Sequence, residues 1–212
     1  MQRFLDLIFT SLAIAILLPV FLILIILLKF SGEGEIFYLQ KRVGKNQREF
    51  KLFKFATMLK NSESMGAGTV TVSNDPRVLP IGSFLRKTKL NEIPQLFNII
   101  LGDMSIIGPR PLHSRQYSFY NTDHKMIISS IRPGLSGVAS IFFRDEEKIL
   151  DSSEDPDHTY KTEITPKKAK YELWYVKNYS ILLYFKLIFL TIAVVLMPKL
   201  NISRFFPGEI ND

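Results

Sequence analysis

The stretch LIFTSLAIAILLPVFLILIILL, residues 7–28, decides the architecture because it contains no charged side chain. An α-helix rises ~1.5 Å per residue, so a helix of this length can cross the ~30 Å apolar layer of a bilayer. The stretch is longer than the roughly 7–15 apolar residues of a signal peptide, and no small-residue cleavage site follows it. We therefore expect a membrane segment that the protein retains.

Pro19 lies near the middle of this segment. A proline inside a helix removes one backbone hydrogen bond and clashes with the preceding turn, so we expect a kink at Leu18-Pro19. The kinked segment could return to the same side as a re-entrant hairpin, or it could span the bilayer with a tolerated proline, and the sequence supports both equally. Lysine and arginine are concentrated after the segment, which predicts that the body of the protein faces the cytoplasm.

A second apolar stretch, ILLYFKLIFLTIAVVLM, occupies residues 181–197 and is interrupted by Lys186. It is short for a membrane span. Aromatic residues at its start, and a lysine able to extend toward water, favour an interfacial amphipathic helix over a buried core helix. We predict three parts: a membrane segment over residues 1–35, a cytoplasmic domain over 36–180, and an apolar or interfacial helix with its tail over 181–212.

Composition limits the possible chemistry. The 212 residues suffice for one domain plus membrane elements, and the net charge of +7 favours a nucleic acid, an anionic lipid surface or a phosphorylated small molecule as partner. The chain has no cysteine, which excludes disulfides, thiolate metal sites and a cysteine nucleophile. Its three histidines have no metal-ligand spacing, so we do not expect a histidine metal site.

The body begins with IFYLQKRVGKNQREFKLFKF, residues 36–55, in which apolar clusters flank a Gly-Lys-Asn turn. This pattern predicts a strand, a turn and a second strand just outside the membrane. Its basic side chains could lie over anionic headgroups, or Arg42 or Lys54 could contact a phosphate. Residues 66–78, GAGTVTVSNDPRV, predict a flexible turn, a short strand and an Asp-Pro turn, and are a weak signal for a phosphate loop.

The next segment, IGSFLRKTKLNEIPQLFNIILG (81–102), has helical apolar spacing, and we expect two helices that meet near Asn91. Pro94 suits the start of the second helix, and Gly102 suits its end. Asn91 could simply be an N-cap. That interpretation leaves unexplained the other polar residues that gather between positions 91 and 110, namely Glu92, Gln95, Asp103 and Arg110.

Two rigid turns carry arginine: GPRP at 108–111 and RPG at 132–134. Proline fixes the backbone, and the forked donors of Arg110 and Arg132 suit bidentate phosphate recognition, although either turn alone could be an ordinary one. No base-reading motif or zinc finger accompanies the arginines, so we do not expect a nucleic acid partner. Together with the predicted strands and helices, these features indicate an α+β, mainly helical protein.

These segments together resemble the bacterial sugar transferases, in the small monotopic form of the phosphoglycosyl transferase family. The resemblance covers nearly the whole chain, and its long central block is the most specific part. It includes the proline-broken N-terminal helix and four further segments: KRVGKNQREFKLFKFATM (41–58), NDPRVLPIGSFLRKTKLNEIPQLFNIILGDMSIIGPRP (74–111), RPGLSGVAS (132–140) and YELWYVKNYS (171–180).

The resemblance implies an enzyme that transfers a sugar 1-phosphate from a UDP-sugar to polyprenyl (undecaprenyl) phosphate, releasing UMP. In the family, this reaction is the first membrane step in the synthesis of surface glycans such as exopolysaccharide or O-antigen. The resemblance also implies a re-entrant N-terminal helix anchored at Leu18 and Pro19 in the bacterial inner membrane, with the active site at the cytoplasmic face. Membrane lipids would then be partners. The amphipathic C-terminal helix leaves room for a homodimer.

Site residues follow from the same resemblance. Attack on a diphosphate requires neutralisation of its charge, which Mg²⁺ and arginines would supply. Glu92 and Asn91 are the expected catalytic residues and Mg²⁺ ligands. The expected substrate-binding residues are Arg110 as the principal phosphate contact, Arg86 as a second one, Gln95, and Arg144 and Glu172 near the nucleotide or sugar.

One departure from the family pattern concerns the reaction itself. The family has an Asp-Glu pair whose aspartate attacks the β-phosphate, and Asn91 stands in place of that aspartate. An amide is no substitute for a carboxylate nucleophile. Four interpretations follow: Glu92 is the nucleophile, transfer is direct, the chain is an inactive scaffold or substrate-binding partner, or Asn91 is an introduced substitution. Smaller departures are Leu18 before the proline, Ala56, and IFFR at 141–144, which we expect to affect the choice of donor sugar.

Overall fold

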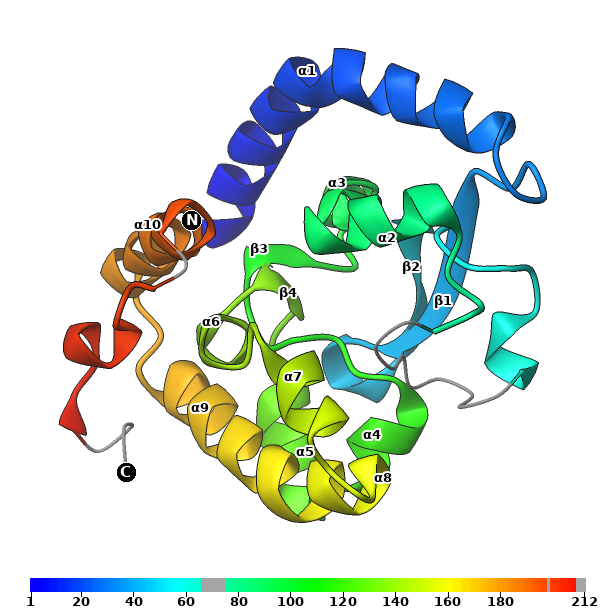
Figure 1. Ribbon diagram of the computed structural model, residues 1–212. Helices are drawn as coiled ribbons and strands as arrows, with labels where there is room; N and C mark the ends of the chain where they lie inside the picture. The colour runs from blue at the N-terminus through cyan, green and yellow to red at the C-terminus, as the bar shows by residue number, and fades with distance from the viewer. Residues whose placement is uncertain (66–74, 198, 209–212) are drawn as a thin grey trace.

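The computed structural model describes residues 1–65, 75–197 and 199–208 (Figure 1). The long helix α1 arches over one side of a mainly helical body, with the β1–β2 hairpin at one end of the arch and α10 at the other. This arrangement confirms a mostly helical α+β protein. The predicted turn and short strand over residues 66–74 lie outside the described residues.

The chain order of the elements is as follows. The strands are β1 (Phe37–Val43), β2 (Glu49–Phe55), β3 (Ser105–Ile107) and β4 (Gly134–Ser136). The helices are α1 (Gln2–Lys29), α2 (Pro80–Lys87), α3 (Gln95–Leu101), α4 (Ser114–Ser118), α5 (Thr122–Ser129), α6 (Val138–Phe142), α7 (Glu146–Asp151), α8 (Pro156–Thr159), α9 (Thr165–Lys177) and α10 (Ile181–Leu196). Short helical turns are η1 (Lys45–Gln47), η2 (Ser62–Ser64), η3 (Leu90–Glu92), η4 (Tyr160–Ile164) and η5 (Ile202–Phe205).

Helix α1 continues through Pro19, and Figure 1 shows it changing direction midway along its length. The predicted kink is consistent with this bend, because the proline removes a backbone hydrogen bond at mid-helix. Within the part of the chain that the structure describes, α1 is the one helix long and apolar enough to cross a membrane. Many of its apolar side chains are exposed, among them Ile16, Leu18 and Ile23.

The start of α1 is fixed to the body by polar side chains, which we call the docking cluster: the partly buried Gln2 and the buried Asp6, Ser105 and Tyr184. Asp6 accepts hydrogen bonds from the Ser105 hydroxyl (2.7 Å), the Ile106 backbone N–H (3.0 Å) and the Tyr184 hydroxyl (2.9 Å). Both of its carboxyl oxygens therefore have partners although the residue is 2% exposed. The cluster joins α1, β3 and α10.

The hairpin and the two central helices agree with the sequence. Strands β1 and β2 pair antiparallel, with Lys54 opposite Tyr38. Pro94 immediately precedes α3, and Gly102 ends it with φ +94°, a left-handed conformation that glycine adopts without steric cost. Asn91 lies inside η3 and makes no capping hydrogen bond, so its interpretation as an N-cap is wrong.

The two arginine-bearing turns lie side by side, because β3 and β4 form a parallel pair directly beside them. Gly134 donates its N–H to Pro109 (2.8 Å), and a Cβ on Gly134 would lie 2.1 Å from the Gly108 nitrogen. Only glycine allows this close approach of two backbones. The pairing fixes the backbone of the turn that carries Arg110.

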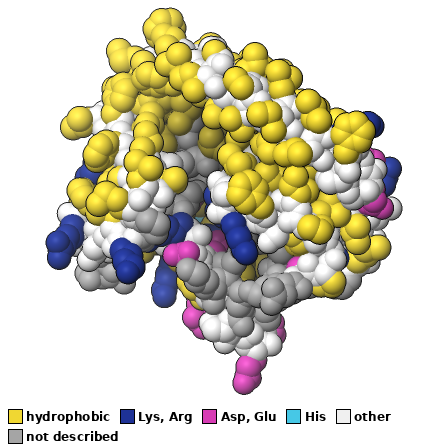
Figure 2. Space-filling model, turned by 45° about the horizontal axis from the view of Figure 1, so that its top comes forward, with side chains coloured by type: hydrophobic (Ala, Val, Ile, Leu, Met, Phe, Trp, Pro, Cys, Tyr) yellow, Lys and Arg dark blue, Asp and Glu magenta, His cyan; other side chains and the backbone are white. Residues whose placement is uncertain are grey.

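Helix α10 uses one face for the core and leaves the other exposed. Tyr184 and Leu187 are fully buried, whereas Leu182 is 81% and Val195 70% exposed. The helix thus combines the two alternatives weighed for it: it is part of the core and also presents an apolar surface. Lys186 is exposed to water, as expected, and its ammonium group also donates to the Phe205 carbonyl. Figure 2 shows hydrophobic side chains on both sides of a central hollow.

Candidate active site

A cavity of about 980 Å³ occupies the hollow between the hairpin, the central helices and α10. Its size is at the upper end of the range for small-molecule sites. The polar wall includes Asn91 and Glu92 of η3 together with a set of basic residues: Arg42, Lys54, Lys60, Arg86, Lys89, Arg110, Arg115, Arg144 and Lys168. The excess of positive charge suits a ligand with more than one phosphate group.

Five of these residues form the centre of the polar wall, and we call them the reaction-centre cluster: Arg42, Lys54, Asn91, Glu92 and Arg110. The Glu92 carboxylate lies 3.4 Å from the Arg110 guanidinium. Burial raises the pKa of Glu92, but Arg110, Lys54 and Lys89 lower it by more, so that its pKa lies below the ordinary value. Glu92 is therefore an ionised carboxylate at neutral pH.

The basic members of the cluster repel one another. Burial, followed by the charge of Arg42, lowers the pKa of Lys54 to about 7. Burial, followed by the charge of Arg110, lowers the pKa of Arg42 to about 10. An anion placed among these cations would relieve both the repulsion and the loss of hydration. The expectation that Arg42 or Lys54 contacts a phosphate thus agrees with their position.

Asn91 is 7% exposed, and its side-chain oxygen is buried with no hydrogen-bond partner. A buried acceptor without a partner costs free energy, typically ~1–3 kcal/mol. A catalytic role or a bound ion or water is among the reasons for which natural proteins keep such an unpaired group. The neighbouring Glu92 carboxylate lines the same cavity. Together these residues present oxygen atoms of the kind that hard divalent cations prefer.

The oxygen donors also limit what metal this site could hold. Within residues 1–65, 75–197 and 199–208, no group of three or more His, Asp or Glu side chains is arranged to bind a metal. Mg²⁺ usually binds proteins through one or two carboxylates and completes its coordination with water and substrate phosphates. The Glu92 carboxylate and the Asn91 amide oxygen fit that mode of binding, in which the substrate supplies most ligands.

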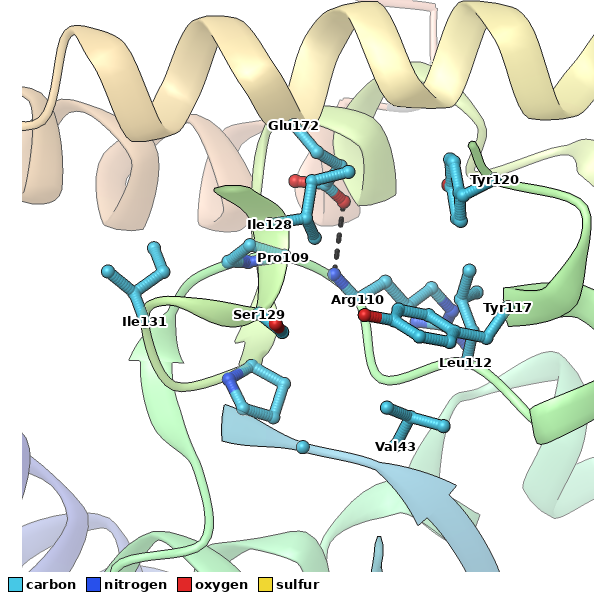
Figure 3. Close-up of a pocket in the computed structure, with 12 residues that line it drawn as sticks. Val43, Pro109, Arg110, Leu112, Tyr117, Tyr120, Ile128, Ser129, Ile131 and Glu172 are labelled. Atoms are coloured by element: carbon cyan, nitrogen blue, oxygen red, sulfur yellow. Dashed lines mark hydrogen bonds between the residues drawn. The ribbon is translucent and has the colours of Figure 1, made fainter. Parts of the chain in front are cut away.

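Behind the cluster, the turn that carries Arg110 is held by Glu172 of α9. Figure 3 shows the Glu172 carboxyl group directed at the Arg110 backbone nitrogen, which donates to Oε1 at 3.0 Å. The second oxygen, Oε2, is buried without a partner beside a small cavity of about 20 Å³. Burial raises the pKa of Glu172 to about 7. Glu172 therefore positions the Arg110 turn and does not line the large cavity, so its expected contact with the nucleotide or sugar has no support from its position.

The remaining predicted site residues separate into two groups. Arg86 and Arg144 line the large cavity, and Arg144 also forms an ion pair with Asp145 at 3.5 Å. Gln95 is 4% exposed and does not line the cavity, so its expected role in substrate binding has no support from its position. Arg132 is likewise directed elsewhere, because it donates to the Gly102 carbonyl (2.7 Å) at the end of α3.

Sequence reasoning missed a second polar group in the cavity wall, formed by Glu146, Tyr160 and Lys168. Lys168 is 3% exposed, forms an ion pair with Glu146 and donates to the Tyr160 hydroxyl at 3.2 Å. The three residues come from α7, η4 and α9, which no motif links in the sequence.

The opposite end of the cavity is apolar. Leu17 of α1 and Ile188, Ile192 and Val195 of α10 contribute to its lining. Ile192 and Val195 are also more than half exposed at the molecular surface. One continuous space therefore extends from the apolar helices to the charged cluster.

Comparisons with known proteins agree with this arrangement. The profile of the family described as "Bacterial sugar transferase" matches residues 1–198. The exopolysaccharide production protein ExoY of Sinorhizobium fredii is 34% identical, with 93% of this chain and 86% of the relative covered. An Aeromonas hydrophila UDP-N-acetylgalactosamine-undecaprenyl-phosphate N-acetylgalactosaminephosphotransferase is 34% identical (92% and 43% covered). A Klebsiella pneumoniae UDP-glucose:undecaprenyl-phosphate glucose-1-phosphate transferase is 33% identical (90% and 39% covered).

The chain thus spans most of ExoY but less than half the length of the other two relatives. The matched region includes α1, the hairpin, the reaction-centre cluster and α10. From the match over residues 1–198 and the coverage of ExoY, the chain belongs to the bacterial sugar transferase family of enzymes.

Proposed function

We propose that this protein transfers a sugar 1-phosphate from a UDP-sugar to undecaprenyl phosphate at the cytoplasmic face of the membrane, releasing UMP. The observation that carries the proposal is the single cavity that joins exposed apolar helices to a cationic centre. A lipid phosphate needs both: an apolar path for its chain and positive charge for its head. A soluble nucleotide sugar needs only the second.

The chemistry requires two negatively charged substrates to meet. An oxygen of the acceptor phosphate forms a bond to the β-phosphorus of the donor, the bond from that phosphorus to the bridging oxygen breaks, and UMP leaves with the electron pair. Arg110 and Lys54 lower the repulsion between the substrates by neutralising phosphate charge. Glu92 holds the Arg110 guanidinium in place through their ion pair at 3.4 Å.

The acceptor attacks directly in our proposal, and no enzyme-linked intermediate forms on residue 91. The amide of Asn91 carries no full charge, so it cannot act as the nucleophile that the family's aspartate provides. The Glu92 carboxylate is engaged with Arg110, which reduces its availability for attack. Asn91 instead offers its unpaired buried oxygen to the ligand.

Magnesium forms part of the proposal as a group bound together with substrate. When bound, Mg²⁺ would supply further charge neutralisation at the diphosphate. Glu92 and Asn91 are the residues that would hold it. The chain's own contribution is to orient these two oxygen donors on η3, where the backbone is fixed between α2 and α3.

The bent α1 supports a re-entrant anchor, with both of its ends on the cytoplasmic side. Exposed apolar residues along α1 would contact lipid, and the docking cluster would hold its first turn to the body. Since the chain has no cysteine, single substitutions Phe4→Cys and Phe30→Cys can be labelled with a membrane-impermeant thiol reagent. Labelling of the two positions from opposite sides would show a spanning helix instead.

The direct test is release of UMP by purified protein with Mg²⁺ and undecaprenyl phosphate, using UDP-glucose, UDP-galactose and UDP-N-acetylgalactosamine. Wild type should release UMP with at least one donor. Glu92→Gln should lose about a thousandfold, because the charge at the centre disappears. Asn91→Asp should gain about tenfold, because a carboxylate adds a nucleophile and a stronger cation ligand.

The controls separate this proposal from its alternatives. Glu163→Gln changes an exposed carboxylate on η4 and should leave the rate unchanged. A protein mass increased by one phosphosugar during turnover of wild type would show that transfer is not direct, and loss of that increase in Glu92→Gln would point to Glu92 as the nucleophile. No release by wild type, with release restored by Asn91→Asp, would identify an inactive member of the family that acts as a scaffold or substrate-binding partner.

A further inference from the structure

We infer that Glu146, Tyr160 and Lys168 recognise the donor's sugar ring and select a neutral hexose or N-acetylhexosamine over a hexuronic acid, an inference that rests on the proposed function. These three residues, which we call the sugar cluster, line the large cavity but take no part in the reaction-centre cluster. Their roles would be to hydrogen-bond ring hydroxyl groups. They would bind the sugar and not the diphosphate.

The sugar cluster is a preformed set of polar groups on elements far apart in the sequence. Lys168 forms its ion pair with Glu146 and also contacts the Tyr160 hydroxyl at 3.2 Å. The ammonium lies 4.9 Å from the centre of the Tyr160 ring and 5.6 Å from that of Phe143. Tyr160 is 4% and Lys168 3% exposed, so neither side chain can reorient freely. This rigidity is what selective recognition of a ring requires.

The position of the sugar cluster places it next to the phosphate that carries the sugar. Lys168 and Glu172 are four residues apart on α9 and therefore lie on the same face, about 6 Å apart along the helix axis. Glu172 contacts the backbone nitrogen of Arg110. The sugar cluster is thus about one helical turn from the turn that bears Arg110, a distance similar to the width of a hexose ring. The charges of Glu146 and Tyr160 also contribute to raising the pKa of Arg110, after that of Glu92.

Other parts of the substrates fit this wall less well. The sugar is joined to the β-phosphate that undergoes attack, whereas the ribose is one phosphate further away. The lipid chain needs the apolar part of the cavity lining, which includes Leu17 of α1 and Ile192 of α10. A carboxylate, an ammonium and a phenol hydroxyl are hydrogen-bonding groups suited to a ring that carries several hydroxyls.

The charge balance of the cluster defines the class of sugar. Lys168 is already neutralised by Glu146, so the pair adds no net positive charge to attract a sugar carboxylate. Burying an ion pair is costly compared with apolar packing, and the cost is offset when a ligand uses the remaining hydrogen-bonding capacity. A neutral hexose or N-acetylhexosamine fits this wall better than a hexuronic acid.

The test compares binding of UDP with binding of UDP-sugars by isothermal titration calorimetry of the purified protein. The probes are UDP, UDP-glucose, UDP-galactose, UDP-N-acetylgalactosamine and UDP-glucuronic acid. For wild type, at least one neutral UDP-sugar should bind about tenfold more tightly than UDP, and UDP-glucuronic acid should not. Tyr160→Phe and Lys168→Met should each reduce that advantage at least about fivefold while leaving the Kd of UDP unchanged.

Two matched variants serve as controls: Tyr171→Phe, whose ring lies outside the cavity lining, and Lys161→Met, whose side chain is exposed. Neither variant should change how much more tightly the neutral UDP-sugar binds than UDP. Equal weakening of UDP and UDP-sugar by Tyr160→Phe would overturn the inference by showing a diphosphate or uridine contact. Unchanged binding of every probe would overturn it by showing a purely structural ion pair. Absence of UDP binding by wild type would overturn the proposed function as well.

Discussion

The molecule contains two polar clusters that differ in whether their members satisfy one another. In the docking cluster, both oxygens of Asp6 accept hydrogen bonds, and Gln2 donates to Ser105 and to the Ile107 carbonyl. In the reaction-centre cluster, like charges lie together and the Asn91 oxygen has no partner. The hydrogen bonds of the first cluster are complete without any ligand, whereas the second keeps an unpaired oxygen and neighbouring positive charges, which suit an anionic ligand.

This difference separates stability from function. A satisfied network stabilises the fold, and its loss should appear as a lower free energy of unfolding. An unsatisfied one costs stability and is maintained where binding or catalysis uses it. Each cluster can therefore be tested by a substitution that should affect one property and leave the other nearly unchanged.

Among three further substitutions, at Arg110, Asp6 and Glu172, the largest effect is expected from Arg110→Met. The guanidinium is the charged group paired with Glu92 at the centre of the cavity, and its removal leaves the phosphates with less neutralisation. UMP release should fall about a hundredfold to a thousandfold. The measurement is kcat/KM for a UDP-sugar that wild type uses. Arg48→Met, at an exposed position of the hairpin, is the matched control, and an equal loss in both variants would refute a specific role for Arg110.

Asp6→Ala should produce the opposite pattern. The substitution removes the acceptor of three hydrogen bonds and leaves buried donors on Ser105, Ile106 and Tyr184. The free energy of unfolding should fall by about 3 kcal/mol, while kcat per folded molecule stays within about twofold of wild type. Thermal unfolding in detergent checks the first value. Asp123→Ala, on the exposed first turn of α5, should leave kcat unchanged and lower the free energy of unfolding by less than about 1 kcal/mol, the usual contribution of an acidic residue at a helix start.

A large loss of kcat in folded Asp6→Ala would show that the two clusters are coupled. Such coupling would have a physical route, because β3 connects Ser105 of the docking cluster to the turn that bears Arg110. The comparison would then need revision: α1 would position the reaction centre as well as anchor the body.

The sequence predicted the elements around both clusters but not the contacts within them. The hairpin, the two helices that meet at Asn91 and the end of α3 at Gly102 follow from local chemistry, since apolar spacing and turn residues act over a few positions. The docking cluster joins Asp6 to Tyr184, and no local pattern links residues so far apart. Arg110 and Arg132 stand in similar turns, yet only tertiary packing directs one to the cavity and the other to the end of α3.

Glu172 lies between the two cases, because one of its oxygens has a partner and the other has none. Its folded-state pKa of about 7 is higher than the ordinary value of about 4.3. The folded protein therefore holds a proton that the unfolded chain releases between these values, and stability due to this group is present below pH ~4 and is lost as the pH rises to ~7. Glu172→Gln removes the titrating group while keeping an oxygen that accepts from Arg110.

This substitution should have the smallest effect of the three, and its sign depends on pH. At pH 8, Glu172→Gln should be more stable than wild type by about 1–2 kcal/mol, because no buried charge forms. At pH 5 the two proteins should differ by much less, since Glu172 is then protonated in the folded state. Melting temperatures at both pH values test this. A difference that is the same at pH 5 and pH 8 would show that Glu172 does not titrate in this range and is held ionised, as a fully satisfied member of the Arg110 turn.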